Sequence, residues 1–194
     1  MKPVPVQGKI WGVILVTIIL SSCEPAPERI IPAGEIVPLK VGNQWAYKVK
    51  IFDEFGTVTD SSHETVKIMN EVVIENELWY VDNDGNVQTN RADGRWVRSD
   101  VAYLVEKFPC KLNEMYRLID TITFVRVRGV DEPVSVPAGR YLTYIYQWMR
   151  NGFLVGDFYY TPNVGMVKSE KYMQRGGGVF LLETKELISY ALKP

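Results

Sequence analysis

Residues 45–52 read Trp-Ala-Tyr-Lys-Val-Lys-Ile-Phe, and this stretch decides the fold. Bulky apolar side chains fall on alternate positions beginning at Trp45, with two lysines between them. Alternation with a period of two is typical of a β-strand that buries one face. The stretch therefore predicts a half-buried strand that carries Trp45 and Tyr47 on the same side.

The same pattern continues along the chain and predicts an all-β protein. Residues 65–75 alternate in the same way, and Asn83-Asp84-Gly85 separates two short apolar runs. Asp-Gly is a hairpin signal because glycine accepts a positive φ. Turn residues return roughly every 8–12 positions, as in sandwiches and barrels. We expect a single antiparallel sheet curled into an open, unclosed barrel or a sandwich. At most short helices are expected, with 99–107 as the one candidate segment.

Composition excludes several classes of protein. The 194 residues are 46% hydrophobic and include five tryptophans, eleven tyrosines and seven phenylalanines, too many for a disordered chain. The 22 basic and 23 acidic side chains give no electrostatic footprint for nucleic acid. One histidine and two cysteines do not supply an ordinary zinc site. We therefore expect no metal, no cofactor and no nucleic-acid partner.

The N-terminus has the layout of a secretory signal. Two lysines precede an apolar run over residues 10–20, which is too short for the roughly 20 residues of a membrane-spanning helix. The following Leu20-Ser21-Ser22-Cys23 resembles the lipobox of bacterial lipoproteins. This resemblance implies cleavage before Cys23 and a thioether-linked diacylglycerol on its thiol. Because two or more acyl chains anchor a protein stably, the mature chain would be held on a membrane without spanning it.

These features predict three segments. Residues 1–22 form a lipoprotein signal peptide, 23–36 an acylated, proline-rich tether, and 37–194 a single all-β domain. Glu24 stands where an aspartate favours the inner membrane in the enteric lipoproteins. The resemblance therefore favours the outer membrane of a bacterial envelope, on its periplasmic side.

A short internal similarity raises the hypothesis of duplication. Residues 37–45 resemble 108–115 with one residue missing, and each segment precedes a strand-rich half. Duplication would give two related halves, 37–107 and 108–194, that share one core. Chance similarity over so few positions is the alternative.

Three longer stretches resemble markers of uncharacterised bacterial envelope lipoproteins. Residues 38–47 are similar to PLxxGNxWxY, 136–141 to VPAGxF with Tyr141 in place of the phenylalanine, and 159–168 to YxPxVGxVK. These markers carry no known chemistry. The resemblance implies the unclosed-barrel shape of lipoprotein and lipid carriers.

The candidates for catalysis and metal binding are weak. His63 lies in a polar segment, and the chain has no G-x-S-x-G elbow. Residues 82–86 lack the downstream glycine and glutamate of an EF-hand loop, and 176–178 lack the ending of a phosphate loop. Cys110 is expected to pack as a small hydrophobe. We therefore expect no enzyme.

Aromatic residues are the candidate ligand-binding group. Tyr144, Tyr146 and Trp148 share one face of the predicted strand 140–149, and Trp45 and Tyr47 share a face near the start of the domain. An ordinary aromatic core is the alternative, because these side chains dominate cores.

Two functions remain open for this lipid-anchored envelope lipoprotein. The favoured hypothesis is a non-catalytic binding module for a lipid or another apolar ligand. The alternative is a structural or assembly partner in an envelope protein complex. An apolar cavity of roughly 300 Å³ or more would favour the first, and a filled interior the second.

Overall fold

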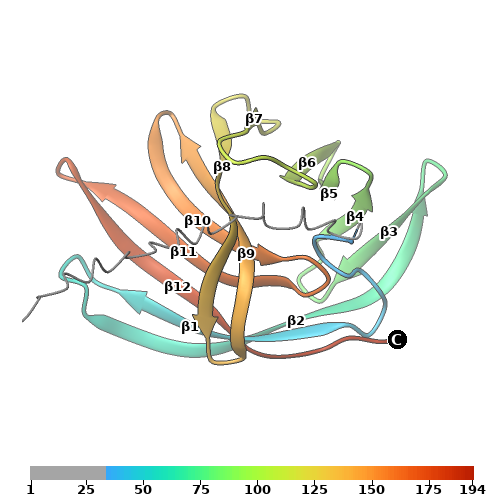
Figure 1. Cartoon of the computed structure of the whole chain (residues 1–194), viewed down its shortest axis with the longest axis horizontal. Helices are drawn as coiled ribbons and strands as arrows, with labels where there is room; N and C mark the ends of the chain where they lie inside the picture. Colours follow the sequence, from blue (N-terminus) through green and yellow to red (C-terminus); the bar gives the residue numbers. More distant parts are fainter. Residues whose placement is uncertain (1–33) are drawn as a thin grey trace, which may run out of the picture. The chain divides into compact units, whose positions relative to one another are not determined.

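The computed structural model describes residues 34–194 as one curled antiparallel sheet (Figure 1). Every regular element in this range is a strand, so the prediction of an all-β, unclosed sheet is confirmed. The strands are β1 (Gln44–Phe52), β2 (Val58–Ile74), β3 (Glu77–Asp82), β4 (Val87–Arg91), β5 (Gly94–Arg98), β6 (Ala102–Lys107), β7 (Met115–Arg117), β8 (Thr123–Val136), β9 (Gly139–Arg150), β10 (Phe153–Thr161), β11 (Gly165–Arg175) and β12 (Gly178–Ala191).

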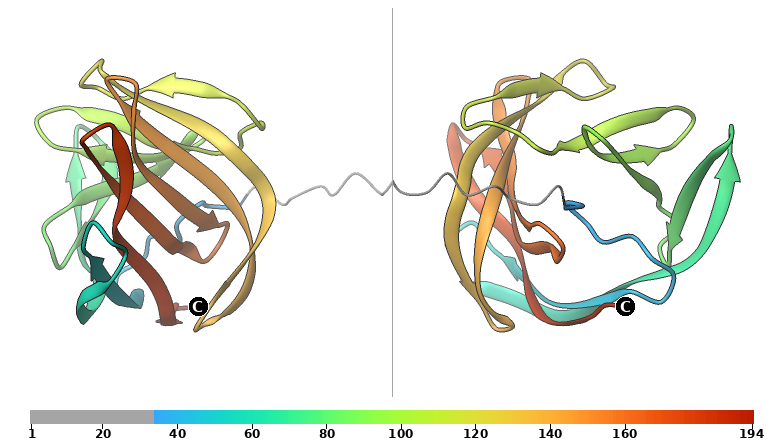
Figure 2. Two further views of the ribbon diagram at one scale, coloured as in Figure 1. Left: turned by 90° about the vertical axis from the view of Figure 1, so that its left-hand side faces the viewer. Right: turned by 45° about the vertical axis from the view of Figure 1, so that its right-hand side comes forward.

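The strand order places the two ends of the domain at the centre of the sheet. Strands β1 to β6 step outward from the middle to one edge, and β7 to β12 step back from the other edge. The last strand, β12, then pairs with β1. Consequently β6 and β7, neighbours in sequence, are the two edges, and the curl of the sheet brings them to the same side of the molecule (Figure 2).

The one candidate segment for a short helix, residues 99–107, contains no helix. Residues 102–107 form the edge strand β6 instead, paired with β5 through Val97 and Tyr103 among other pairs. Aromatic and β-branched side chains such as Tyr103 and Val105 favour a strand, and pairing with β5 satisfies the backbone groups on one side of it.

Tyrosine hydroxyls, rather than a backbone ladder, join the two edges of the sheet. Tyr116 of β7 donates to the carbonyl of Val105 at 2.7 Å and accepts from the backbone N–H of Lys107 at 3.1 Å. Tyr146 of β9 donates to the Lys107 carbonyl at 2.8 Å. We call this contact between β6 and β7 the seam.

The two segments that resemble each other in sequence form the same turn. Before β1, the Asn43 N–H donates to the Lys40 carbonyl at 3.0 Å, and Gly42 has a φ of +91°. The Gly42 N–H then donates to the carbonyl of Ile68 on β2, and the Ile68 N–H donates back to Asn43, both at 2.9 Å.

Before β7, the same hydrogen bonds recur. The Glu114 N–H donates to the Lys111 carbonyl at 3.1 Å, and Asn113 has a φ of +65°. Asn113 and Glu114 exchange two backbone bonds of 2.8 Å with Val127 on β8. The turns match without a gap in the sequence, although the common origin of the two halves stays a prediction.

The segment that enters β1 is part of the core. Ile36 is 1% exposed and Leu39 is 5% exposed. The side-chain amide of Asn90 on β4 donates to the Val37 carbonyl at 2.7 Å, and the Asn163 N–H donates to the carbonyl of Glu35 at 2.8 Å. The predicted signal peptide lies outside the described residues, as does the predicted tether up to residue 33. Within 34–194 no helix is long and apolar enough to cross a membrane.

Loss of the Tyr116 hydroxyl should loosen the seam. The Tyr116→Phe variant leaves the partly buried Lys107 N–H without its acceptor, so we expect the free energy of unfolding to fall by about 1–3 kcal/mol. Tyr103→Phe on β6 is the matched control, because that hydroxyl makes no hydrogen bond within the described domain. Urea unfolding of both variants checks this, and equal losses would contradict the role given to the seam.

Candidate functional site

A cavity of about 310 Å³ lies inside the curl of the sheet. Its wall is mostly aromatic and aliphatic, with a polar patch contributed by β3 to β5 and the loop between β3 and β4. Both halves of the chain contribute side chains. The lining residues are Val37, Trp45, Tyr47, Val66, Asp82, Asn86, Gln88, Arg95, Val97, Tyr103, Val105, Trp148, Tyr160 and Met166.

Strand register explains why these side chains meet. Trp45 is paired with Val66, and Val97 is paired with Gln88 on one side and Tyr103 on the other. Directly paired residues of antiparallel strands project from the same face. The alternation seen in the sequence therefore places these side chains on the inner face of the sheet.

A buried ion pair forms the polar patch of the cavity. Arg95 Nε donates to a carboxylate oxygen of Glu106 at 2.6 Å, and the two side chains are 15% and 1% exposed. The same guanidinium donates to Gln88 Oε1 at 2.9 Å and to the Tyr160 hydroxyl at 3.4 Å. The charge of Arg95 is thus compensated and its hydrogen bonds are distributed over three partners.

Burial and neighbouring charges shift the pKa values of the arginine and the two tyrosines that line the cavity. Burial disfavours the charged guanidinium, but the carboxylate of Glu106 and the hydroxyl of Tyr160 outweigh it and raise the pKa of Arg95 above its usual value. Burial raises the pKa of Tyr160 and of Tyr47 well above the usual value for a phenol. At neutral pH the arginine is therefore a cation and both tyrosines are uncharged.

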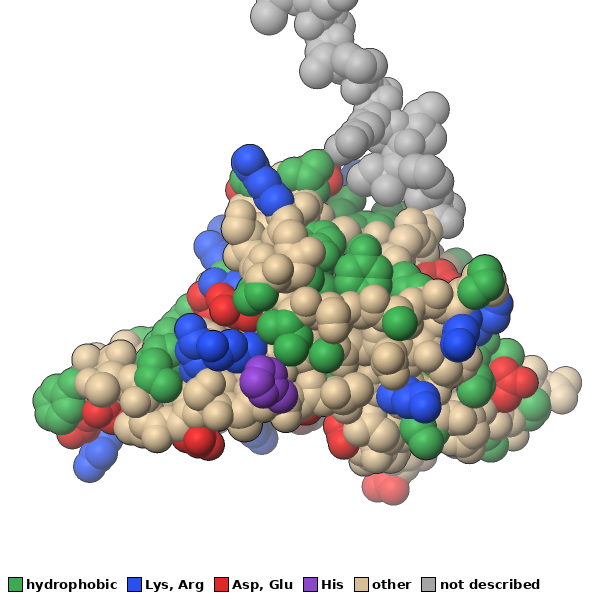
Figure 3. Space-filling model, turned by 90° about the horizontal axis from the view of Figure 1, so that it is seen from below, with side chains coloured by type: hydrophobic (Ala, Val, Ile, Leu, Met, Phe, Trp, Pro, Cys, Tyr) green, Lys and Arg blue, Asp and Glu red, His purple; other side chains and the backbone are tan. Residues whose placement is uncertain are grey.

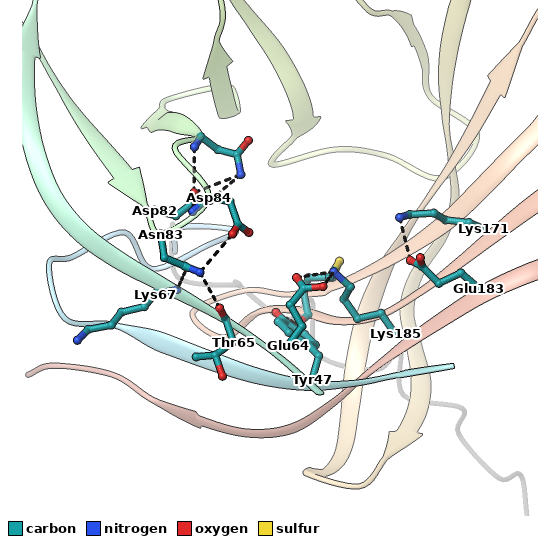
Figure 4. Close-up of polar contacts among 12 residues, drawn as sticks. Tyr47, Glu64, Thr65, Lys67, Asp82, Asn83, Asp84, Lys171, Glu183 and Lys185 are labelled. Carbon is teal, nitrogen blue, oxygen red and sulfur yellow. Dashed lines mark hydrogen bonds and ion pairs between the residues drawn. The ribbon is translucent and has the colours of Figure 1, made fainter. Parts of the chain in front are cut away.

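Asp82 organises the loop at the rim of the cavity (Figure 4). Its Oδ1 accepts the backbone N–H groups of Asp84 at 3.0 Å and Asn86 at 2.9 Å, and its Oδ2 accepts the Asn86 amide at 2.9 Å. Gly85 has a φ of +83°, as the hairpin signal requires. The carboxylate is thus used to hold the turn, and no cluster of three potential metal ligands occurs within 34–194.

Beyond Tyr47 the same face of the sheet becomes charged. Lys185 Nζ lies 2.6 Å from both carboxylate oxygens of Glu64, next to the ring of Tyr47 (Figure 4). Lys171 and Glu183 form a further pair at 2.8 Å. One end of the cavity therefore borders on paired charges.

The structure divides the five predicted ligand-binding aromatics into two groups. Trp45, Tyr47 and Trp148 line the cavity, and their role in binding stays a prediction. Tyr144 and Tyr146, at 4% and 0% exposed, lie outside its lining. Tyr144 packs edge-on against Phe108 with ring centroids 5.2 Å apart, and Tyr146 joins the seam. These two side chains belong to the core.

Sequence reasoning missed the polar patch. Arg95, Gln88 and Glu106 are not among the candidate residues that the sequence analysis names. The sequence does contain one indication: Arg95 and Val97 are two residues apart on a predicted strand, so their side chains are expected on the same face. Because the sequence does not show which face of this strand is buried, the spacing alone does not identify Arg95 as a buried charge.

Other groups that carry reactive chemistry lie elsewhere. His63, the purple side chain in Figure 3, is exposed on β2. The Cys110 thiol is partly buried, and burial raises its pKa to about 11, so it is protonated at neutral pH. Cys23 lies outside the described residues.

A second polar cluster on β10 and β11 is internally satisfied. Glu170 accepts the hydroxyls of Tyr159 at 2.8 Å and Tyr172 at 3.0 Å, and it pairs with Lys168 at 2.7 Å. Asp157, 5% exposed, pairs with Arg128 at 3.2 Å. The polar side chains of this cluster are therefore already bonded to one another.

Removing Glu106 should destabilise the domain strongly. Glu106→Ala leaves Arg95 buried without its counter-charge, so we expect a loss of about 3–5 kcal/mol in the free energy of unfolding. Glu77→Ala breaks the more exposed Arg91–Glu77 pair, with side chains 33% and 32% exposed, and should cost about 1 kcal/mol or less. Denaturant unfolding compares the two, and similar losses would contradict the burial of the Arg95 charge.

Comparison with known proteins gives one structural resemblance. No family model matches the chain, and no curated protein matches its sequence. A crystal structure of a "putative lipoprotein" from Parabacteroides distasonis ATCC 8503 is similar at 13% sequence identity and a TM-score of 0.45. The match covers 81% of this chain and 99% of the other.

Proposed function

We propose that this chain is a lipid-anchored protein of the bacterial cell envelope and that its β-domain is a non-catalytic binding module for a lipid or another apolar ligand. The observation that carries the proposal is the cavity. Its volume of about 310 Å³ lies at the lower end of the roughly 300–1,000 Å³ range of small-molecule pockets. A mostly apolar wall with a few convergent polar groups is the usual composition of such pockets.

The size of the cavity limits the part of a ligand that it takes. A water-sized group occupies about 30 Å³ in a liquid, so the cavity accommodates roughly ten such groups. That corresponds to a segment of one acyl chain or a small apolar molecule rather than a whole multi-chain lipid. Burial of each methylene contributes roughly 0.8 kcal/mol, so a short segment is enough for measurable affinity.

Placement in the envelope is supported by the N-terminal sequence. Leu20-Ser21-Ser22-Cys23 resembles a lipobox, and acylation of Cys23 would moor the domain to a membrane. Residues 24–33 include three prolines and would span a few tens of ångströms at about 3 Å per residue. We place the domain at the outer membrane on the periplasmic side.

A role as an assembly partner in an envelope complex is the second candidate. Leu112, which precedes the edge strand β7, and Met115, its first residue, are each 55% exposed. Edge strands also offer unpaired backbone groups to another chain. Crosslinking in cells followed by purification tests this role. A stoichiometric protein partner whose recovery falls with Met115→Lys would favour assembly over ligand binding.

Acylation at Cys23 is directly testable. Cells that express the full chain and are grown with a labelled fatty acid should yield labelled protein, because the Cys23 thiol accepts the diacylglycerol. The Cys23→Ser variant should be unlabelled and leave the membrane fraction. Cys110→Ser removes the other cysteine and serves as the matched control, which should behave as the unmodified chain does. Labelling that persists in Cys23→Ser would contradict the proposed anchor.

Filling the cavity should abolish binding without unfolding the domain. Val97 lines the cavity, so Val97→Trp places a large ring in the space proposed for the ligand. We expect affinity for 1-octanol, measured by calorimetry, to fall at least tenfold. Val58→Trp, at a position 47% exposed on β2, is the control and should leave affinity unchanged. Thermal unfolding confirms that both variants fold, and unchanged affinity in a folded Val97→Trp would contradict the proposed site.

A further inference from the structure

The wall of the cavity carries an excess of negative charge. Asp82 and Arg95 belong to the lining, and Glu106 lies 2.6 Å from the Arg95 guanidinium. The two carboxylates therefore outnumber the one cation. The neighbouring pair of Glu64 and Lys185 adds equal and opposite charges and leaves this excess unchanged.

Hydrogen bonds link the charged groups to one another. Gln88 accepts from Arg95 Nη1 at 2.9 Å, and its amide nitrogen lies 3.5 Å from Asp82 Oδ2. Arg95 is the one lysine or arginine among the side chains that line the cavity, and Glu106 already pairs with it. An anionic ligand would therefore meet no uncompensated cation on this wall.

We propose that the cavity selects uncharged acyl esters over free fatty acids. This inference rests on the proposed function and names its ligand class. The carboxylate of a fatty acid would lose its hydration in the cavity. It would also add a negative charge to the net negative charge of Asp82, Glu106 and Arg95. An ester carries the same chain and a carbonyl acceptor without that charge, so its transfer into the cavity costs much less.

Three probes that carry the same eight-carbon chain but different charges separate the effect of charge on affinity from the effect of hydrophobic burial. Methyl octanoate, octanoate and octylammonium are offered at pH 8 to the full acylated chain in phosphatidylcholine nanodiscs. Equilibrium dialysis of labelled probe measures binding, and the same measurement on Val97→Trp corrects for partition into the bilayer. We expect methyl octanoate to bind at least tenfold more tightly than octanoate, with octylammonium between them.

The outcomes distinguish this inference from the proposed function. Octanoate that binds as tightly as its ester, or more tightly than octylammonium, would overturn the ligand class while leaving the cavity as the binding site. Absence of binding by all three probes would overturn the proposed function, and the ligand class with it.

Removal of one carboxylate should change the selectivity in a defined direction. Glu106→Gln keeps the size of the side chain and an acceptor for Arg95 but removes a negative charge. We expect affinity for octanoate to rise at least tenfold and affinity for the ester to change less than threefold. Glu77→Gln, at an ion pair outside the cavity lining, should alter neither. Unchanged selectivity in a folded Glu106→Gln variant would overturn the inference. If that variant does not fold, the ratio of the affinities for methyl octanoate and octanoate in the unmodified protein decides.

Discussion

The number of strands is the constraint from which the rest of the structure follows. Eight strands closed into a barrel leave an interior just wide enough for side chains to fill, and the diameter grows with strand number. By the same rule, twelve strands curled on themselves surround a wider interior than eight do. The chain fills much of that space with aromatic rings and with the segment that includes Ile36 and Leu39. The cavity is the part of the interior that remains.

Because the sheet does not close into a barrel, it has two edge strands, β6 and β7. Edge strands expose backbone groups that invite aggregation, and short edges limit this exposure. Here β7 has three residues and β6 has six. The hydroxyls of Tyr116 and Tyr146 bond to backbone groups of β6 and so connect the two edges, which form no backbone ladder with each other. The seam thus lies next to the cavity, because Val105 both lines the cavity and accepts the hydrogen bond from Tyr116.

Local patterns in the sequence were sufficient for the fold class and insufficient for the site. Alternation around Trp45 and the Asp-Gly turn report on backbone conformation, which is a local property, and both predictions hold. Closure of the curl depends on residues distant in sequence, such as Tyr116 and Val105 on opposite edges. The same limit explains why Tyr144 could not be separated from Trp148: both lie on one face of β9, and only the curvature of the sheet determines which of them reaches the cavity. Residues 102–107 form a strand for a related reason, because their conformation is fixed by β5.

The entry segment has a mechanical consequence. The Val37 side chain lines the cavity, its carbonyl is bonded to Asn90, and Ile36 beside it is almost fully buried. Tension applied to the chain ahead of residue 34 would therefore act on Ile36 and Val37, inside the curled sheet, before it reaches β1. With the lipid anchor proposed at Cys23, such tension would act on the wall of the cavity, so that a force on the anchor would change the affinity for a bound ligand.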